Sequence, residues 1–134
     1  MPSEDPDRFV ALRILLTADA AVLLSLGFAL IFVPDTLAGV FHFGHLPDVV
    51  DYIGGFLGCA FVSLGAGYVM ATTDPIRHAV WVVIGIARGA FEVLLSIACV
   101  LRGAVTWQQA SFGIAFAAFI TVGYAILYPR AERR

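Results

Sequence analysis

The sequence predicts an all-α integral membrane protein, a bundle of four transmembrane helices. Apolar residues make up 60% of its 134 residues and charged residues only 13%, against ~25% charged in ordinary globular chains. The sequence also contains four apolar runs, each near the ~20 residues that a helix needs to cross a bilayer. These runs are residues 9–33, 52–71, 79–101 and 109–128.

Each apolar run stops at residues that disfavour helix continuation or membrane burial. In chain order these are Pro34-Asp35, Asp74-Pro75, Arg102-Gly103 and Pro129-Arg130. Residues 9–128 therefore form one predicted membrane domain with an outer loop at 34–51. Residues 1–8 are expected to be a disordered cytoplasmic tail, and residues 129–134 a basic cytoplasmic tail.

Arginine placement predicts the orientation, because basic residues collect on the cytoplasmic side. The chain has no lysine. With the N-terminus inside, the cytoplasmic ends carry Arg8, Arg13, Arg77, Arg130, Arg133 and Arg134, whereas the outer loops carry only Arg102. We therefore expect both termini in the cytoplasm and a multi-pass protein of a bacterial inner (plasma) membrane.

Small residues recur at four-residue spacing, which lets helix backbones approach closely in lipid. The main stripes are Gly55, Cys59, Ser63 and Gly67 in the second run, Gly85 and Gly89 in the third, and Gly113 and Ala117 in the fourth. A further pair, Gly54 and Gly58, lies beside the first stripe. We interpret them as packing within the bundle or as a homo-oligomer seam, with the second run lying centrally.

Three charged residues lie inside the apolar runs, where ionised groups are costly and usually pair. Asp19 lies about 15 Å into the first run and Arg88 about 14 Å into the third, at ~1.5 Å per residue. Glu92 follows Arg88 by four residues, on the same helix face. We predict a buried cluster of these three residues that draws the first and third helices together.

The cluster has two interpretations. Arg88 fixes the two helices and nothing more, or the group is a site for a proton or a cationic or polar ligand. Two acids and one base leave a net charge of −1 or one protonated carboxyl. Polar side chains that could line such a site are those of Thr17, Ser63, Ser96 and Thr121.

The outer loop contains four side chains of metal-binding types at three-residue spacing, namely His42, His45, Asp48 and Asp51. The alternative interpretation is an interfacial segment followed by a helix that starts near Pro47, with acids in its first turn. No phosphate-binding glycine loop, Cys-x-x-Cys motif or nucleophile elbow occurs. We predict no cofactor, and the net charge of −2 gives no case for nucleic acid.

A family resemblance covers about residues 9–75. It rests on Gly27-Phe-Ala-Leu-Ile-Phe-Val-Pro34, then Phe41-His-Phe-Gly44, then Asp51-Tyr-Ile-Gly-Gly-Phe-Leu-Gly58. These stretches resemble the small bacterial four-helix membrane proteins of the DoxX-like and BphX-like type. The resemblance implies the same architecture and no site residues.

Three functions remain open. The favoured one is a non-catalytic accessory or assembly subunit of an inner-membrane complex, whose partners are other membrane subunits or copies of itself. The second is a small oligomeric proton-coupled carrier or channel that uses Asp19 and Glu92. The third is a membrane enzyme or metal-binding protein that uses loop 34–51.

Overall fold

The structure is a computed structural model that describes residues 6–128. In chain order its helices are α1 (Pro6–Phe32), α2 (Pro34–Val40), α3 (Asp48–Thr73), α4 (Ala79–Leu101) and α5 (Trp107–Leu127). Within the described residues, α1, α3, α4 and α5 are long and apolar enough to cross a membrane. The predicted all-helical bundle with four such helices is confirmed.

The observed helix ends differ from the predicted ones where local capping extends a helix. Residues 6–8, expected in a disordered tail, form the first turn of α1, where Pro6 and Asp7 are both favourable. In the same way α5 starts at Trp107, because Thr106 and Gln109 form a reciprocal capping box. The expected tails at 1–5 and 129–134 lie outside the described residues.

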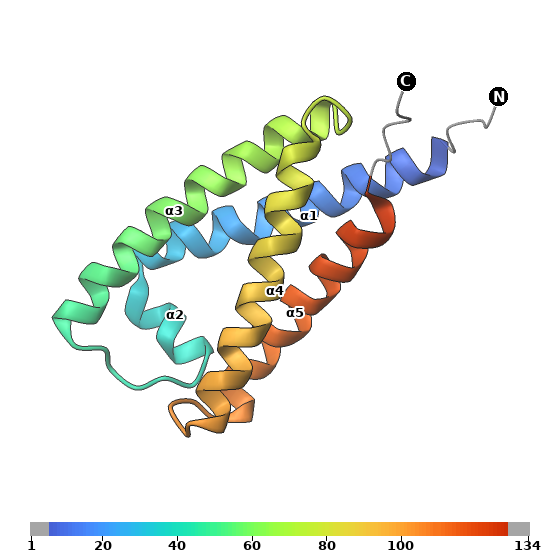
Figure 1. The fold of residues 1–134 in the computed structure, drawn as a ribbon. Coiled ribbons are helices and arrows are strands. Elements are labelled where there is room, and N and C mark those ends of the chain that lie inside the picture. Colours follow the sequence, from blue (N-terminus) through green and yellow to red (C-terminus); the bar gives the residue numbers. More distant parts are fainter. Residues whose placement is uncertain (1–5, 129–134) are drawn as a thin grey trace.

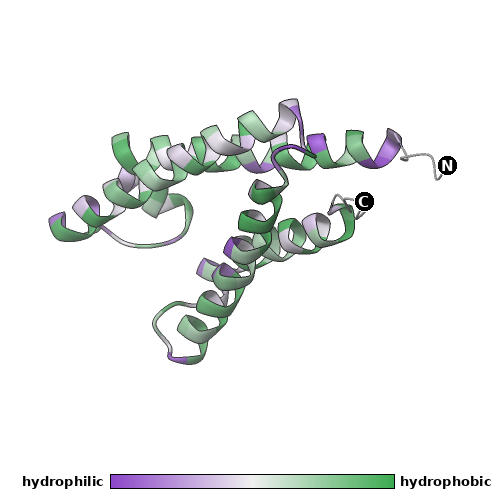
Figure 2. Ribbon diagram, turned by 45° about the horizontal axis from the view of Figure 1, so that its top comes forward, coloured by the Kyte–Doolittle hydropathy of each residue, from purple (hydrophilic) through white to green (hydrophobic). Residues whose placement is uncertain are grey.

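The long helices form two antiparallel pairs. α1 packs mainly on α3, and α4 packs mainly on α5; α1 also contacts α5, and α3 touches α4 less. Figure 1 shows α1 beside α3 on one side of the molecule and α4 beside α5 on the other. In the view of Figure 2 the two pairs diverge from one another. The central helix is therefore α1, not the second apolar run as expected.

The α1–α3 pair is close because two glycines face one another. A Cβ atom added to Gly58 would lie 2.7 Å from the carbonyl oxygen of Gly27, and one added to Gly27 would lie 2.8 Å from that of Gly58. Neither backbone could approach so closely if either residue had a side chain. In lipid, where no hydrophobic effect draws helices together, such contact is a main source of association.

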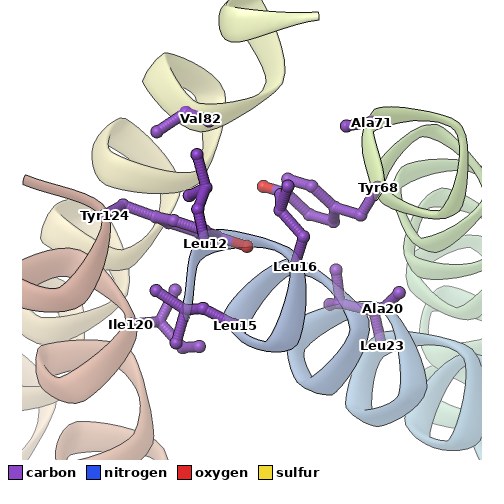
Figure 3. Packing of buried hydrophobic residues seen from close by; sticks show 10 residues of the cluster. All are labelled: Leu12, Leu15, Leu16, Ala20, Leu23, Tyr68, Ala71, Val82, Ile120 and Tyr124. Carbon is purple, nitrogen blue, oxygen red and sulfur yellow. The ribbon is translucent and has the colours of Figure 1, made fainter. Parts of the chain in front are cut away.

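The core lies where α1 meets the other long helices. Figure 3 shows leucines of α1 surrounded by Tyr68 of α3, Val82 of α4, and Ile120 and Tyr124 of α5. Large apolar side chains elsewhere point outward; Phe56, Leu94 and Phe119 are each more than 60% exposed. Figure 2 shows the same apolar character along all four long helices. An apolar exterior of this kind suits lipid as the solvent.

Two arginines join the ends of the helices at the face where α1 begins and α3 ends. Arg8 donates from Nη2 to the carbonyl oxygen of Ile126 at 2.9 Å, and Arg13 from Nη2 to that of Thr73 at 3.2 Å. Carbonyls at a helix C-terminus have no partner within the helix, so a guanidinium there satisfies them. At the opposite face Gly103 takes a positive φ of 72° and ends α4.

Candidate functional site

A salt bridge between α4 and α1 forms the centre of the candidate site. Nη2 of Arg88 lies 2.6 Å from Oδ1 of Asp19. The Asp19 side chain is fully buried, and that of Arg88 is 12% exposed. The structure thus brings together the two residues that the depth estimate placed in one plane of the bilayer.

The second oxygen of Asp19 is bound by a residue that the sequence analysis missed. The hydroxyl of Tyr124, on α5, donates to Oδ2 of Asp19 at 2.9 Å. Buried tyrosines usually find a hydrogen-bond partner, and that was the only available signal. The depth of Tyr124 in its apolar run did not suggest a contact with Asp19, because Tyr124 lies close to the end of its helix. It reaches Asp19 only because α5 is inclined across α1.

Glu92 is held much more loosely than Asp19. Its Oε1 lies 3.4 Å from Nη1 of Arg88, and its side chain is 37% exposed. This is the only hydrogen bond that the Glu92 side chain makes within residues 6–128. Arg88 therefore contacts both carboxylates, as the sequence predicts, but the pairing is unequal. Asp19 is enclosed by Arg88 and Tyr124, whereas the carboxylate of Glu92 remains accessible.

Tyr68 of α3 completes the surroundings of the guanidinium. Cζ of Arg88 lies 5.7 Å from the centre of the Tyr68 ring, within the range of a cation–π contact. The Tyr68 hydroxyl and Nε of Arg88 are buried and have no hydrogen-bond partner among the described residues. All four long helices thus contribute a side chain to this centre. Figure 3 shows Tyr68 and Tyr124 among the buried apolar side chains of the core.

The salt bridge between Asp19 and Arg88 forms although α1 and α4 do not pack on one another. The backbones of these two helices are not in contact. α1 packs mainly on α3, α4 packs mainly on α5, and α1 also contacts α5. The expectation that the charges draw the first and third spans together is therefore wrong for the backbones. The long side chain of Arg88 crosses the gap between the two pairs, so no close backbone approach is required.

A cavity opens between the two helix pairs next to the charges. Its volume is about 400 Å³, and its walls come from all five helices and the segment after α2. Most of the lining is leucine and phenylalanine, and among the described residues only Arg88 and Glu92 bring a charge to it. Asp19 does not line it. Ligand cavities typically combine an apolar lining with a few polar groups in this way.

Of the polar side chains expected near the charges, only Ser96 lines this cavity. The hydroxyls of Thr17, Ser63 and Thr121 instead donate to the carbonyl oxygens of Arg13, Cys59 and Ala117, four residues earlier in their own helices. Such bonds satisfy a hydroxyl locally. Gln109, which the sequence analysis did not consider, adds an amide to the cavity wall.

The small-residue stripes divide into packed and unpacked parts. Gly85 and Gly89 of α4 lie against Tyr124 and Thr121 of α5, and Ala117 is buried. Gly67 packs on Trp81.

The rest of the predicted stripes lies away from helix contacts. Cys59 and Ser63 are exposed, and a Cβ atom at Gly55 would meet nothing within 4 Å. Gly113 also has open space around it, because it lines the cavity. The prediction that these four residues pack within the bundle is therefore wrong; α3 uses the neighbouring stripe, with Gly58, against α1.

The structure does not assemble the predicted metal-binding residues. Within residues 6–128 no three His, Cys, Asp or Glu side chains are grouped so that they could hold a metal ion. His45 instead lies 3.2 Å from Asp35 of α2. His42 ends α2 with a positive φ of 61°, whereas Asp48 and Asp51 belong to the first turn of α3. The extended segment between α2 and α3 separates the histidines from the aspartates.

Comparison of the chain with models of known protein families, with curated proteins and with solved structures finds no match.

Proposed function

We propose that this chain is a non-catalytic accessory or assembly subunit of a membrane complex, in a bacterial inner membrane with both termini in the cytoplasm. The observation that supports the proposal is the unused stripe on α3. Gly55, Cys59 and Ser63 face outward at four-residue spacing, while the adjacent stripe of the same helix is occupied by α1. Small residues in a lipid-facing position provide a surface on which another transmembrane helix can pack.

The test is purification of the tagged chain in mild detergent, followed by mass spectrometry of the proteins that remain bound. We expect a stoichiometric partner subunit, and we expect Gly55→Leu and Ser63→Leu each to release it. Both positions are open, so the larger side chains leave the fold intact and block only the approach of a second helix. Ala115→Leu, at an exposed position of α5, is the matched control and should retain the partner. A chain that purifies alone, or a partner unaffected by both substitutions, contradicts the proposal.

A small oligomeric proton-coupled carrier or channel is the second candidate, and the cavity favours it. Glu92 is the carboxylate that lines this space, whereas Asp19 is enclosed by Arg88 and Tyr124. In this candidate Glu92 exchanges the proton and Asp19 holds Arg88 in place. The third candidate was a membrane enzyme or metal-binding protein that uses loop 34–51. Its metal site has no support, because within residues 6–128 no three His, Cys, Asp or Glu side chains are grouped to hold a metal ion.

A further inference from the structure

We propose that the cavity between the helix pairs binds a lipophilic organic monocation, with the positive centre at Glu92 and the apolar groups along the leucine and phenylalanine walls. This ligand site is additional to the partner surface on α3, and neither depends on the other.

Charge supports a cation. Within residues 6–128, the charged residues that line the cavity are Arg88 and Glu92. The charge of Arg88 is matched by Asp19 at 2.6 Å, and its side chain is mostly buried. Glu92 has only the 3.4 Å contact to the same guanidinium. With all three groups ionised, the cluster carries a net charge of −1, which is located on the carboxylate that a ligand can reach.

The walls support a lipophilic ligand. Leu26 and Leu30 of α1 and Leu95 of α4 face the space together with Phe61, Phe112 and Phe116. Burial of alkyl or aryl groups against such walls is favourable from water, and phenylalanine faces also attract cations. A volume of about 400 Å³ is at the lower end of the ~300–1,000 Å³ typical of small-molecule sites. A compact ligand is therefore expected.

Two probes of similar shape separate charge from hydrophobicity: tetraphenylphosphonium, a cation, and triphenylphosphine oxide, a neutral hydrogen-bond acceptor. Binding of each is measured at equilibrium to the full chain in lipid nanodiscs. We expect saturable binding of the cation and weaker binding of the oxide. Glu92→Gln should weaken cation binding by about ten-fold or more, as expected for loss of a charge pair away from water. The oxide should be unaffected, and Glu92→Asp should restore part of the cation affinity.

A second substitution tests the location independently of Glu92. Gly113 lines the cavity, and a Cβ atom there would meet nothing within 4 Å. Gly113→Leu therefore places a larger side chain in the cavity and should lower the affinity for both probes. Ala115→Leu, at an exposed position of α5 outside the cavity, should change neither. If the cation fails to bind, or binds Glu92→Gln as well as the unchanged chain, the proposal is wrong. It is also wrong if Gly113→Leu binds normally, or if the oxide binds more tightly, which would indicate a neutral ligand such as an acyl chain. Co-purification of a partner subunit is measured in a different experiment, so failure of either proposal can be told from failure of the other.

Discussion

Tyr68 and Tyr124 stack with their ring centres 6.2 Å apart, yet only the Tyr124 hydroxyl has a hydrogen-bond partner within residues 6–128. Both rings are fully buried. Replacing each tyrosine by phenylalanine keeps the ring and removes only the hydroxyl, so the two substitutions together measure the hydroxyl contact to Asp19.

Tyr124→Phe should destabilise the fold by about 1–3 kcal/mol, because it leaves an oxygen of Asp19 buried without a donor. Tyr68→Phe removes a buried hydroxyl that has no partner among the described residues, so it should be neutral or slightly stabilising. The free energy of unfolding in mixed detergent micelles measures both. Equal losses for the two variants would contradict the assigned hydrogen bond.

Removal of Arg88 should be more damaging than removal of the whole ion pair. Arg88→Met leaves the buried carboxylate of Asp19 without its cation, which typically costs about 3–5 kcal/mol. The double variant Asp19→Asn, Arg88→Met removes the buried carboxylate together with its cation, and the amide oxygen introduced in place of the carboxylate can still accept from Tyr124. Glu92 loses its contact to Arg88 in both variants, so that loss cancels in the comparison. We therefore expect the double variant to be the more stable of the two in the same unfolding assay. An additive loss, with the double variant worse than either single one, would show that the two residues do not interact.

Gly58→Ala should loosen the α1–α3 pair, whereas Gly55→Ala should not. The new Cβ at Gly58 would lie 2.7 Å from the carbonyl oxygen of Gly27, and that oxygen belongs to backbone that cannot rotate away. Forced overpacking of this kind typically costs about 1–3 kcal/mol. At Gly55 the same substitution meets nothing within 4 Å. Thermal unfolding of the two purified variants gives the comparison; similar midpoints would refute the assigned contact.

Part of the candidate site could be predicted from the sequence because depth in a membrane depends only on residue count and rise. Counting from the ends of the apolar runs placed Asp19 and Arg88 at the same level, and the structure joins them at 2.6 Å. The same count gave no reason to consider Tyr124. Its contact depends on how α5 inclines across α1, and inclination follows from side-chain packing that a single sequence does not specify.

The rotation of each helix about its own axis could not be predicted from the sequence either. The pattern showed two adjacent small-residue stripes on α3 but could not decide between them, since both satisfy the same spacing rule. The side chains of α1 decide it: Gly27 meets Gly58, and Gly55 is left facing outward. The same uncertainty about rotation hid the role of Gly113, which lines a cavity instead of a helix contact.

It was predictable from the residues alone that four helices are long and apolar enough to span a bilayer and that three charges lie among them. Length and hydropathy are local properties, and each run reports them without reference to its neighbours. That Asp19 is enclosed while Glu92 lines a cavity depends instead on how the helices pack. That difference arises because the helices associate as two pairs that diverge, and the space between them is a property of the assembled fold.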